Sequence, residues 1–201
     1  MPLLDDEPTV HSRRLLRTGL PLFLLALVLS ILIHQTAHSL VYKKACGGQA
    51  GPASVPSLVR EDRTECPAAS LAGTIATFAT AIASFAVYAR NTRRLFWGSM
   101  AFVNAAIRIP SGVAVFLQLL IGQKSDLAVD ESVALRLLHQ HDPAVSILLI
   151  CFYSLTLLFL AITIVHDTRI LPGKWMIASC LFVGIIPLEL LIRRALGMLP
   201  L

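Results

Sequence analysis

Two histidines near the end of the first long apolar stretch, His34 and His38, are the side chains best placed for chemistry. Four residues apart on a helix, they lie on one face about one turn from each other. This spacing lets both imidazoles reach one metal ion, but it cannot place them on opposite sides of a haem iron. The alternative is that both rings reach the polar interface of a membrane as separate side chains. The spacing alone leaves both interpretations open.

Three more polar side chains fall inside apolar stretches, namely Asn104, Arg108 and Glu189. Arg108 follows Asn104 by one helical turn, so the two share a face. An arginine inside a membrane needs an acidic or carbonyl partner, and Glu189 is the one acidic residue in the predicted spans. We therefore expect a pair between Arg108 and Glu189, with contact to a substrate or a lipid phosphate as the alternative.

The elements that must position these residues are membrane helices. The chain is 56% hydrophobic and 14% charged, and its charges cluster between long apolar runs. This blockwise pattern is typical of bilayer spans, which need roughly 20 apolar residues each and must be helical. We predict an all-α polytopic protein with about five transmembrane helices in one compact bundle. The predicted spans are 18–42, 68–89, 95–121, 144–165 and 175–192.

The basic residues predict the orientation. Arginines precede the first span and follow the second, while residues 122–143 carry four acidic residues against Lys124 and Arg136. Because basic residues stay on the cytoplasmic side, we expect a cytoplasmic segment 1–17 and a membrane domain over 18–201, in a bacterial inner membrane. Residues 43–67 then form an external loop, and 122–143 form a loop or interfacial helix. Arg193 and Arg194 would lie outside after a fifth full span, against this rule, so the alternative for the last segment is a re-entrant or interfacial one.

An external loop allows a disulfide. Cys46 and Cys66 bracket residues 47–65, and a bond between them would close this loop; two unpaired thiols are the alternative. The expected partners are the lipid bilayer and other membrane proteins. The sequence has no basic stripe interleaved with aromatic residues, so we expect no nucleic-acid partner.

The histidine segment resembles the site-2 protease family of intramembrane zinc metalloproteases, especially its short bacterial branch. The family carries His-Glu-x-x-His on a membrane helix, and this chain has His34-Gln35-Thr36-Ala37-His38. The family's Ala-Gly-Pro-like step is similar to residues 71–74, where Thr74 stands in place of the proline. Its Asn- and Pro-containing segment is similar to residues 104–110, which lack the metal-binding Asp that the family has there. The resemblance implies zinc as cofactor and a transmembrane protein as substrate. It also implies Asp130, or less readily Glu131, as the third metal ligand beside His34 and His38.

One departure from the family concerns the catalytic position. The motif glutamate is the general base, and Gln35 has no useful basicity. Its loss typically costs 10²–10⁴-fold in rate, so we expect no peptidase activity, whereas metal binding by the histidines is unaffected. Either the chain is a non-catalytic relative, or glutamine has replaced a natural glutamate.

Two other classes of function stay open. The first is a non-catalytic subunit that packs into a larger membrane complex through the small residues of the second span. The second is a small transporter or lipid-handling protein in which Asn104, Arg108 and the histidines line a polar cavity.

Overall fold

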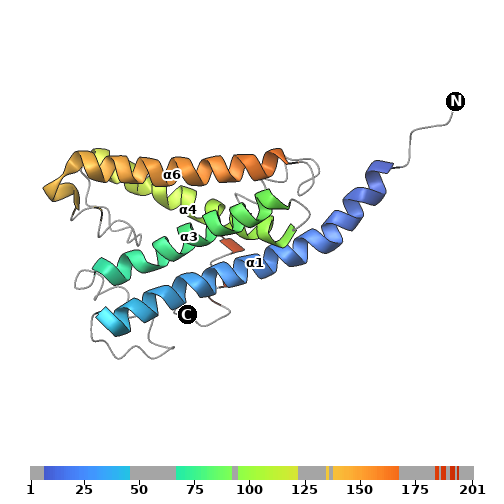
Figure 1. Cartoon of the computed structure of the whole chain (residues 1–201), viewed down its shortest axis with the longest axis horizontal. Helices are drawn as coiled ribbons and strands as arrows, with labels where there is room; N and C mark the ends of the chain where they lie inside the picture. The colour runs from blue at the N-terminus through green and yellow to red at the C-terminus, as the bar shows by residue number, and fades with distance from the viewer. Residues whose placement is uncertain are drawn as a thin grey trace.

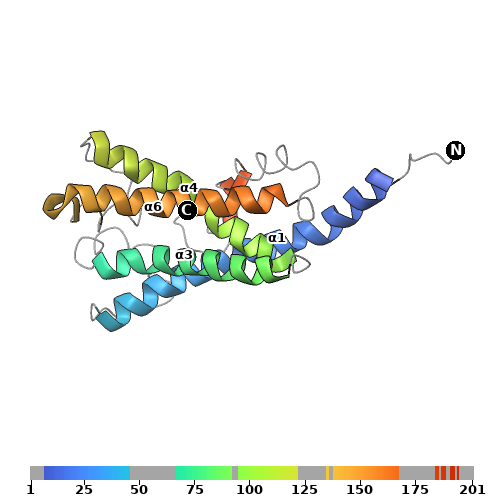
Figure 2. The same cartoon turned by 45° about the horizontal axis from the view of Figure 1, so that its top comes forward.

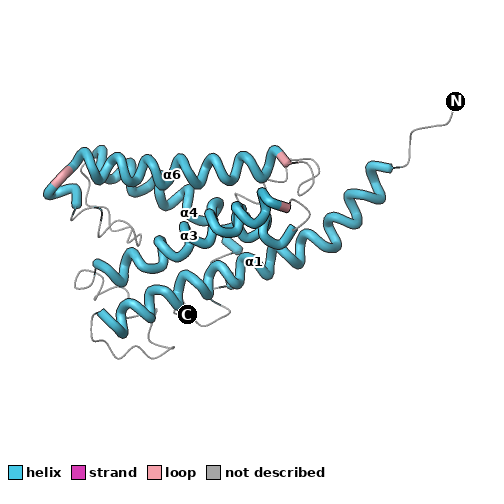
Figure 3. Tube along the Cα trace, in the orientation of Figure 1, coloured by secondary structure: helices cyan, strands magenta, loops and turns pink. Residues whose placement is uncertain are grey.

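Four long helices make up most of the part of this protein that the structure describes (Figure 1). The computed structural model describes residues 7–45, 67–91, 95–121, 135, 138–167, 184–185, 187–188, 191–192 and 194. Over these residues the chain is helical except at Asn91, Asp142 and Asp167, with no strand (Figure 3). The helices are α1 (Glu7–Ala45), α3 (Pro67–Arg90), α4 (Leu95–Ile121) and α6 (Pro143–His166).

Each helix contains a segment long and apolar enough to cross a membrane. These segments are Gly19–Ala45, Ala68–Arg90, Leu95–Ile121 and Pro143–His166, so four of the five predicted spans and the all-α polytopic class are confirmed. The fifth predicted span, 175–192, lies mostly outside the described residues, as do most of residues 122–143. Helix α1 starts at Glu7, well before the predicted span, because a change from polar to apolar side chains marks a bilayer boundary and does not by itself end a helix.

Local signals fix both ends of α6. Asp142 is its N-cap, and the carboxylate accepts a hydrogen bond from the backbone N–H of Val145 at 3.1 Å. Pro143 follows in the first turn, where its missing N–H costs nothing. At the other end the backbone N–H of Asp167 bonds back to the carbonyls of Thr163 and Ile164. Such capping satisfies groups that helix termini otherwise leave without partners.

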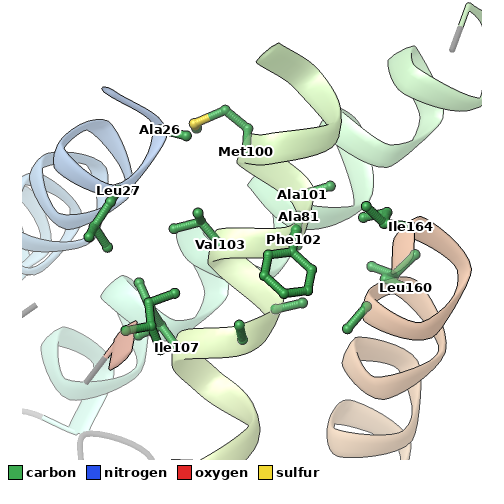
Figure 4. Packing of buried hydrophobic residues seen from close by; sticks show 14 of the residues in the cluster. Ala26, Leu27, Ala81, Met100, Ala101, Phe102, Val103, Ile107, Leu160 and Ile164 are labelled. Atoms are coloured by element: carbon green, nitrogen blue, oxygen red, sulfur yellow. The ribbon is translucent and has the colours of Figure 1, made fainter. Parts of the chain in front are cut away.

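Helix α4 is the centre of the bundle. Its residues 98–108 are buried without interruption, as expected for a helix enclosed by others. It packs against α1, α3 and α6 and crosses α6 at an angle (Figure 2). In the core, Met100 lies against Ala26 of α1, while Phe102 faces α6 near Leu160 (Figure 4).

The outer surface is as apolar as the core. On α6, four large side chains are about two-thirds exposed and recur at helical spacing: Leu148, Phe152, Leu155 and Phe159. A stripe of this kind is stable only in contact with lipid or another apolar surface. The polar side chains described next lie on the opposite, inward side of the helices.

Candidate functional site

Both motif histidines point into the bundle. His34 is 1% exposed and His38 is 7% exposed, and Ser30, one turn before His34, is buried as well. These three residues recur every four positions, so they form the inner face of α1 toward α3 and α4. The interpretation of the histidines as separate side chains at the polar interface is therefore wrong.

Gly73 of α3 provides the space for the two rings. A Cβ at this position would overlap His38 Nε2 and would lie 2.6 Å from His34 Nδ1. The backbone of α3 thus passes directly against both imidazoles. Gly73 belongs to the small-residue segment of the second predicted span, and the structure shows that it packs against the motif histidines.

Two acceptors on α3 hold the ring orientations. His38 Nδ1 lies 2.6 Å from the carbonyl oxygen of Ala69, which can only accept, so Nδ1 carries the proton. The Thr77 hydroxyl donates to the carbonyl of Gly73 at 2.8 Å, which leaves its oxygen to accept from His34 Nδ1 at 3.1 Å. In both rings the proton is on Nδ1 and the lone pair is on Nε2. Metal-binding histidines are commonly oriented in this way, by a hydrogen bond from the other ring nitrogen.

The two Nε2 atoms face each other at 3.0 Å, with the rings nearly perpendicular at 89°. Two lone pairs at this distance repel unless a cation or a donated proton lies between or beside them. Adjacent nitrogen ligands of a tetrahedral zinc ion, at 2.0–2.1 Å from the metal, are about 3.3 Å apart. The separation of the two Nε2 atoms is close to this value.

Arg108 reaches the same point from α4. Its Nη2 lies 2.7 Å from both ring nitrogens of His34. An atom equally distant from both ring nitrogens does not lie along the lone pair of either one, so the guanidinium packs against the imidazole ring. Arg108 is 6% exposed, so a positive charge lies inside the bundle beside the histidine pair.

A second polar link joins α1 and α4 one turn away. Ser30 donates to Asn104 Oδ1 at 2.7 Å, and Asn104 Nδ2 donates to the carbonyl of Met100 at 2.7 Å. The pairs Ser30–Asn104 and His34–Arg108 have the same sequence separation, so α1 and α4 run parallel in register. The helical spacing of Ser30 from His34 was the signal that could have identified this residue from the sequence.

Several predicted site residues lie outside the described part of the chain: Asp130, Glu131, Glu189, Cys46 and Cys66. The expected Arg108–Glu189 pair is thus untested, and the contact seen for Arg108 is with His34. Gln35 is half-buried beside the histidine face. Among the described residues, no group of three or more His, Cys, Asp or Glu side chains could hold a metal ion.

Comparison of the chain with protein-family models, curated proteins and solved structures finds no match.

Proposed function

We propose that this chain is a membrane protein, similar in plan to the site-2 proteases, that binds a divalent metal ion through His34 and His38 without hydrolysing peptides. The observation that supports this most directly is the pair of Nε2 atoms, 3.0 Å apart, each with its Nδ1 proton held by an acceptor on α3. We take zinc as the first candidate, because two imidazoles in this arrangement suit a tetrahedral ion.

The resemblance to the site-2 proteases implies a carboxylate as the third ligand. The four spans contain no Asp or Glu, so the carboxylate must come from another part of the chain. Asp130 is our candidate for the third ligand, with Glu131 as the second choice, because both belong to the segment after α4. A site with three protein ligands leaves one position open.

Gln35 limits what the site can do. A bound zinc ion would supply a Lewis acid, but hydrolysis also requires a group that accepts a proton. An amide cannot act as that base at physiological pH. The side chain next to His34 is therefore neutral, and the site serves to hold an ion and not to cleave a peptide bond.

Elemental analysis of detergent-purified protein, prepared without chelators, tests the proposal. The wild type is expected to hold about one zinc per chain, and His34→Ala and His38→Ala are expected to lose it. His139→Ala is the matched control, because that ring bonds to Ser146 outside the cluster and its loss should leave the zinc content unchanged. A folded wild-type protein with no metal would contradict the proposal.

The network also favours one competing function, that of a non-catalytic subunit in a membrane complex. Arg108 contacts His34 directly, and Asn104 and Ser30 bond to each other, so the polar groups can act as a purely structural link between helices. These mutual contacts argue less for a transport cavity. A metal-free protein that copurifies with a stoichiometric membrane partner would establish the subunit interpretation.

A further inference from the structure

The cluster of His34, His38 and Arg108 is closed in this structure, because each of the three side chains is 7% exposed or less. An ion or molecule can reach it only when part of the bundle moves. We propose that α4 consists of two parts joined at Pro110, and that the second part, residues 111–121, swings away from α1 and α3 to open the cluster. This inference concerns access and goes beyond the proposed function, because it applies to any ligand of the cluster.

One face of α4 changes its partner helix at this proline. Five buried residues recur on the face at intervals of three or four, as helical geometry requires: Asn104, Arg108, Gly112, Val115 and Leu119. The first two contact α1, at Ser30 and His34. The last three pack against α6, Gly112 at Ser154 and the other two in a small separate core with Ile150. The second part of α4 is therefore attached to α6, while the first part is attached to the helix that carries the histidines.

The two parts also differ in how far other helices enclose them. Residues 98–108 are buried on every side, whereas three side chains of the second part are about half exposed on one face, namely Val113, Leu117 and Leu120. In both Figure 1 and Figure 2 the last residues of α4 lie nearer to α6 than to the end of α1. Segments with fewer buried contacts open at a lower free energy than the core of a protein does. The second part of α4 is thus the part that can move.

The residues at the junction weaken the helix there. Pro110 has no N–H to donate to the carbonyl of Ala106, and its ring crowds that carbonyl, which is how a proline kinks a helix. Directly after it, the Ser111 hydroxyl donates to the carbonyl of Arg108 at 2.9 Å. Side-chain bonds of this kind offer the backbone an alternative to its helical hydrogen bonds. Bending of α4 is therefore concentrated directly after Arg108.

Helix α6 can follow this movement because it is held at its other end. The Tyr88 hydroxyl of α3 donates to Asp167 at the end of α6, and Leu160 and Ile164 near that end belong to the main core. The beginning of α6 instead shares the small core with residues 111–121. Meanwhile α1 and α3 stay paired through the hydrogen bond between His38 and Ala69. The two pairs of helices can thus separate at the end of the bundle where the histidines lie.

Modification of the histidines by diethyl pyrocarbonate, read by mass spectrometry of the detergent-purified protein, tests the access. A chelator is present throughout, so that no metal protects the rings. Because a buried imidazole reacts only while the bundle is open, Pro110→Ala, which restores the N–H, is expected to slow the modification of His34 and His38 at least about fivefold. His139 is the internal reference, since its ring bonds to Ser146 outside the cluster. Pro21→Ala is the matched control, because it removes a proline from α1 and leaves α4 intact.

Hydrogen exchange of the wild type tests the same movement without a variant. Residues 111–121 and 143–154 should exchange through one shared opening, with the same dependence on temperature. Residues 98–108 of α4 and 67–77 of α3 should exchange at least about tenfold more slowly. If Pro110→Ala does not fold, this measurement decides alone.

The outcomes separate this inference from the proposed function. Unchanged modification of His34 and His38 in folded Pro110→Ala would overturn the hinge. Exchange of residues 67–77 as fast as that of residues 111–121 would also overturn it, because the whole end of the bundle would then open. A protein that binds no metal but shows the expected slowing in Pro110→Ala would contradict the proposed function alone and support the hinge.

Discussion

The backbone of Gly73 lies directly against the ring of His34. A Cβ added to Gly73 would lie 2.5 Å from His34 Cε1 and 2.6 Å from Nδ1, inside van der Waals contact. The ring cannot simply turn away, because Thr77 and Arg108 both hold it. Close approach of the two helices therefore depends on the missing side chain at position 73.

This contact predicts the effect of Gly73→Ala. The added methyl group must push both imidazoles or separate α1 from α3, and overpacking of this kind costs about 1–3 kcal/mol. We expect a lower thermal unfolding temperature in detergent and loss of bound metal. Gly19→Ala is the matched control, since a Cβ there meets nothing within 4 Å. Equal stability of Gly73→Ala and Gly19→Ala would contradict the packing described above.

A second glycine predicts a rescue. A Cβ at Gly112 of α4 would lie 2.5 Å from Ser154 Oγ on α6 but 3.6 Å from Ser154 Cβ. The Ser154 hydroxyl is buried without a hydrogen-bond partner among the described residues, so Ser154→Ala alone should be neutral or stabilising by up to about 1 kcal/mol. Gly112→Ala should destabilise, and the double variant should regain most of that loss.

The measurement is a double-mutant cycle of unfolding temperatures. A coupling between positions 112 and 154 of about 0.5–3 kcal/mol is expected for residues in contact. Additive effects of the two substitutions would show that contact with the Ser154 hydroxyl is not the cause of the destabilisation by Gly112→Ala.

A third prediction concerns the link between α3 and α6 at the end opposite to the histidines. The Tyr88 hydroxyl donates to Asp167 Oδ2 at 2.5 Å, and the Tyr88 side chain is buried. Tyr88→Phe should destabilise by about 1.5–3 kcal/mol, the range for hydrogen bonds to charged groups. Asp167→Asn, which keeps an acceptor oxygen, should cost less. A larger loss for Asp167→Asn than for Tyr88→Phe would contradict this order.

The membrane helices were predictable because apolar length is a property of the sequence alone. The span 95–121 coincides with α4, and the spans in α3 and α6 agree within a residue or two. The start of α1 at Glu7 was not predicted. Hydropathy indicates which residues lie in the bilayer, and it does not indicate where the helix that contains them begins.

The partners inside the bundle were harder to predict. The sequence paired Arg108 with Glu189 by charge, and Glu189 lies outside the described residues, so this pair stays a prediction. The contact between Arg108 and the ring of His34 was not predicted. The face of α4 that meets α1 depends on which residues of the two helices lie opposite each other. A single sequence does not encode this alignment as a simple pattern. Thr77 was missed as a site residue for the same reason, because its partner His34 lies on another helix.

The fourth prediction is the external disulfide. His38 near the end of α1 contacts Ala69 near the start of α3, and the two helix ends lie side by side (Figures 1 and 2). Cys46 and Cys66 directly follow and precede these ends in the sequence. We expect an oxidised pair on the outer side, so both thiols should react with a membrane-impermeant label only after reduction. Labelling of both cysteines without reductant would rule out the bond, and protection of residues 43–67 in intact cells would reverse the topology.

The last prediction concerns Gln35. It is half-buried, one residue after His34 and three before His38, which is the position of the general base in the family that the motif resembles. A glutamate there would restore a proton acceptor, and general-base catalysis typically contributes 10²–10⁴-fold. As it stands, the protein should show no peptidase activity against a panel of transmembrane peptides.

Gln35→Glu is expected to give measurable cleavage only when the metal and its carboxylate ligand are both present. Adding His34→Ala or Asp130→Asn to Gln35→Glu should therefore abolish the activity, whereas Gln35→Ala should match the inactive wild type. Zinc-loaded Gln35→Glu with no cleavage would show that the bundle lacks more than the base, and the site would then be one that holds an ion without chemistry.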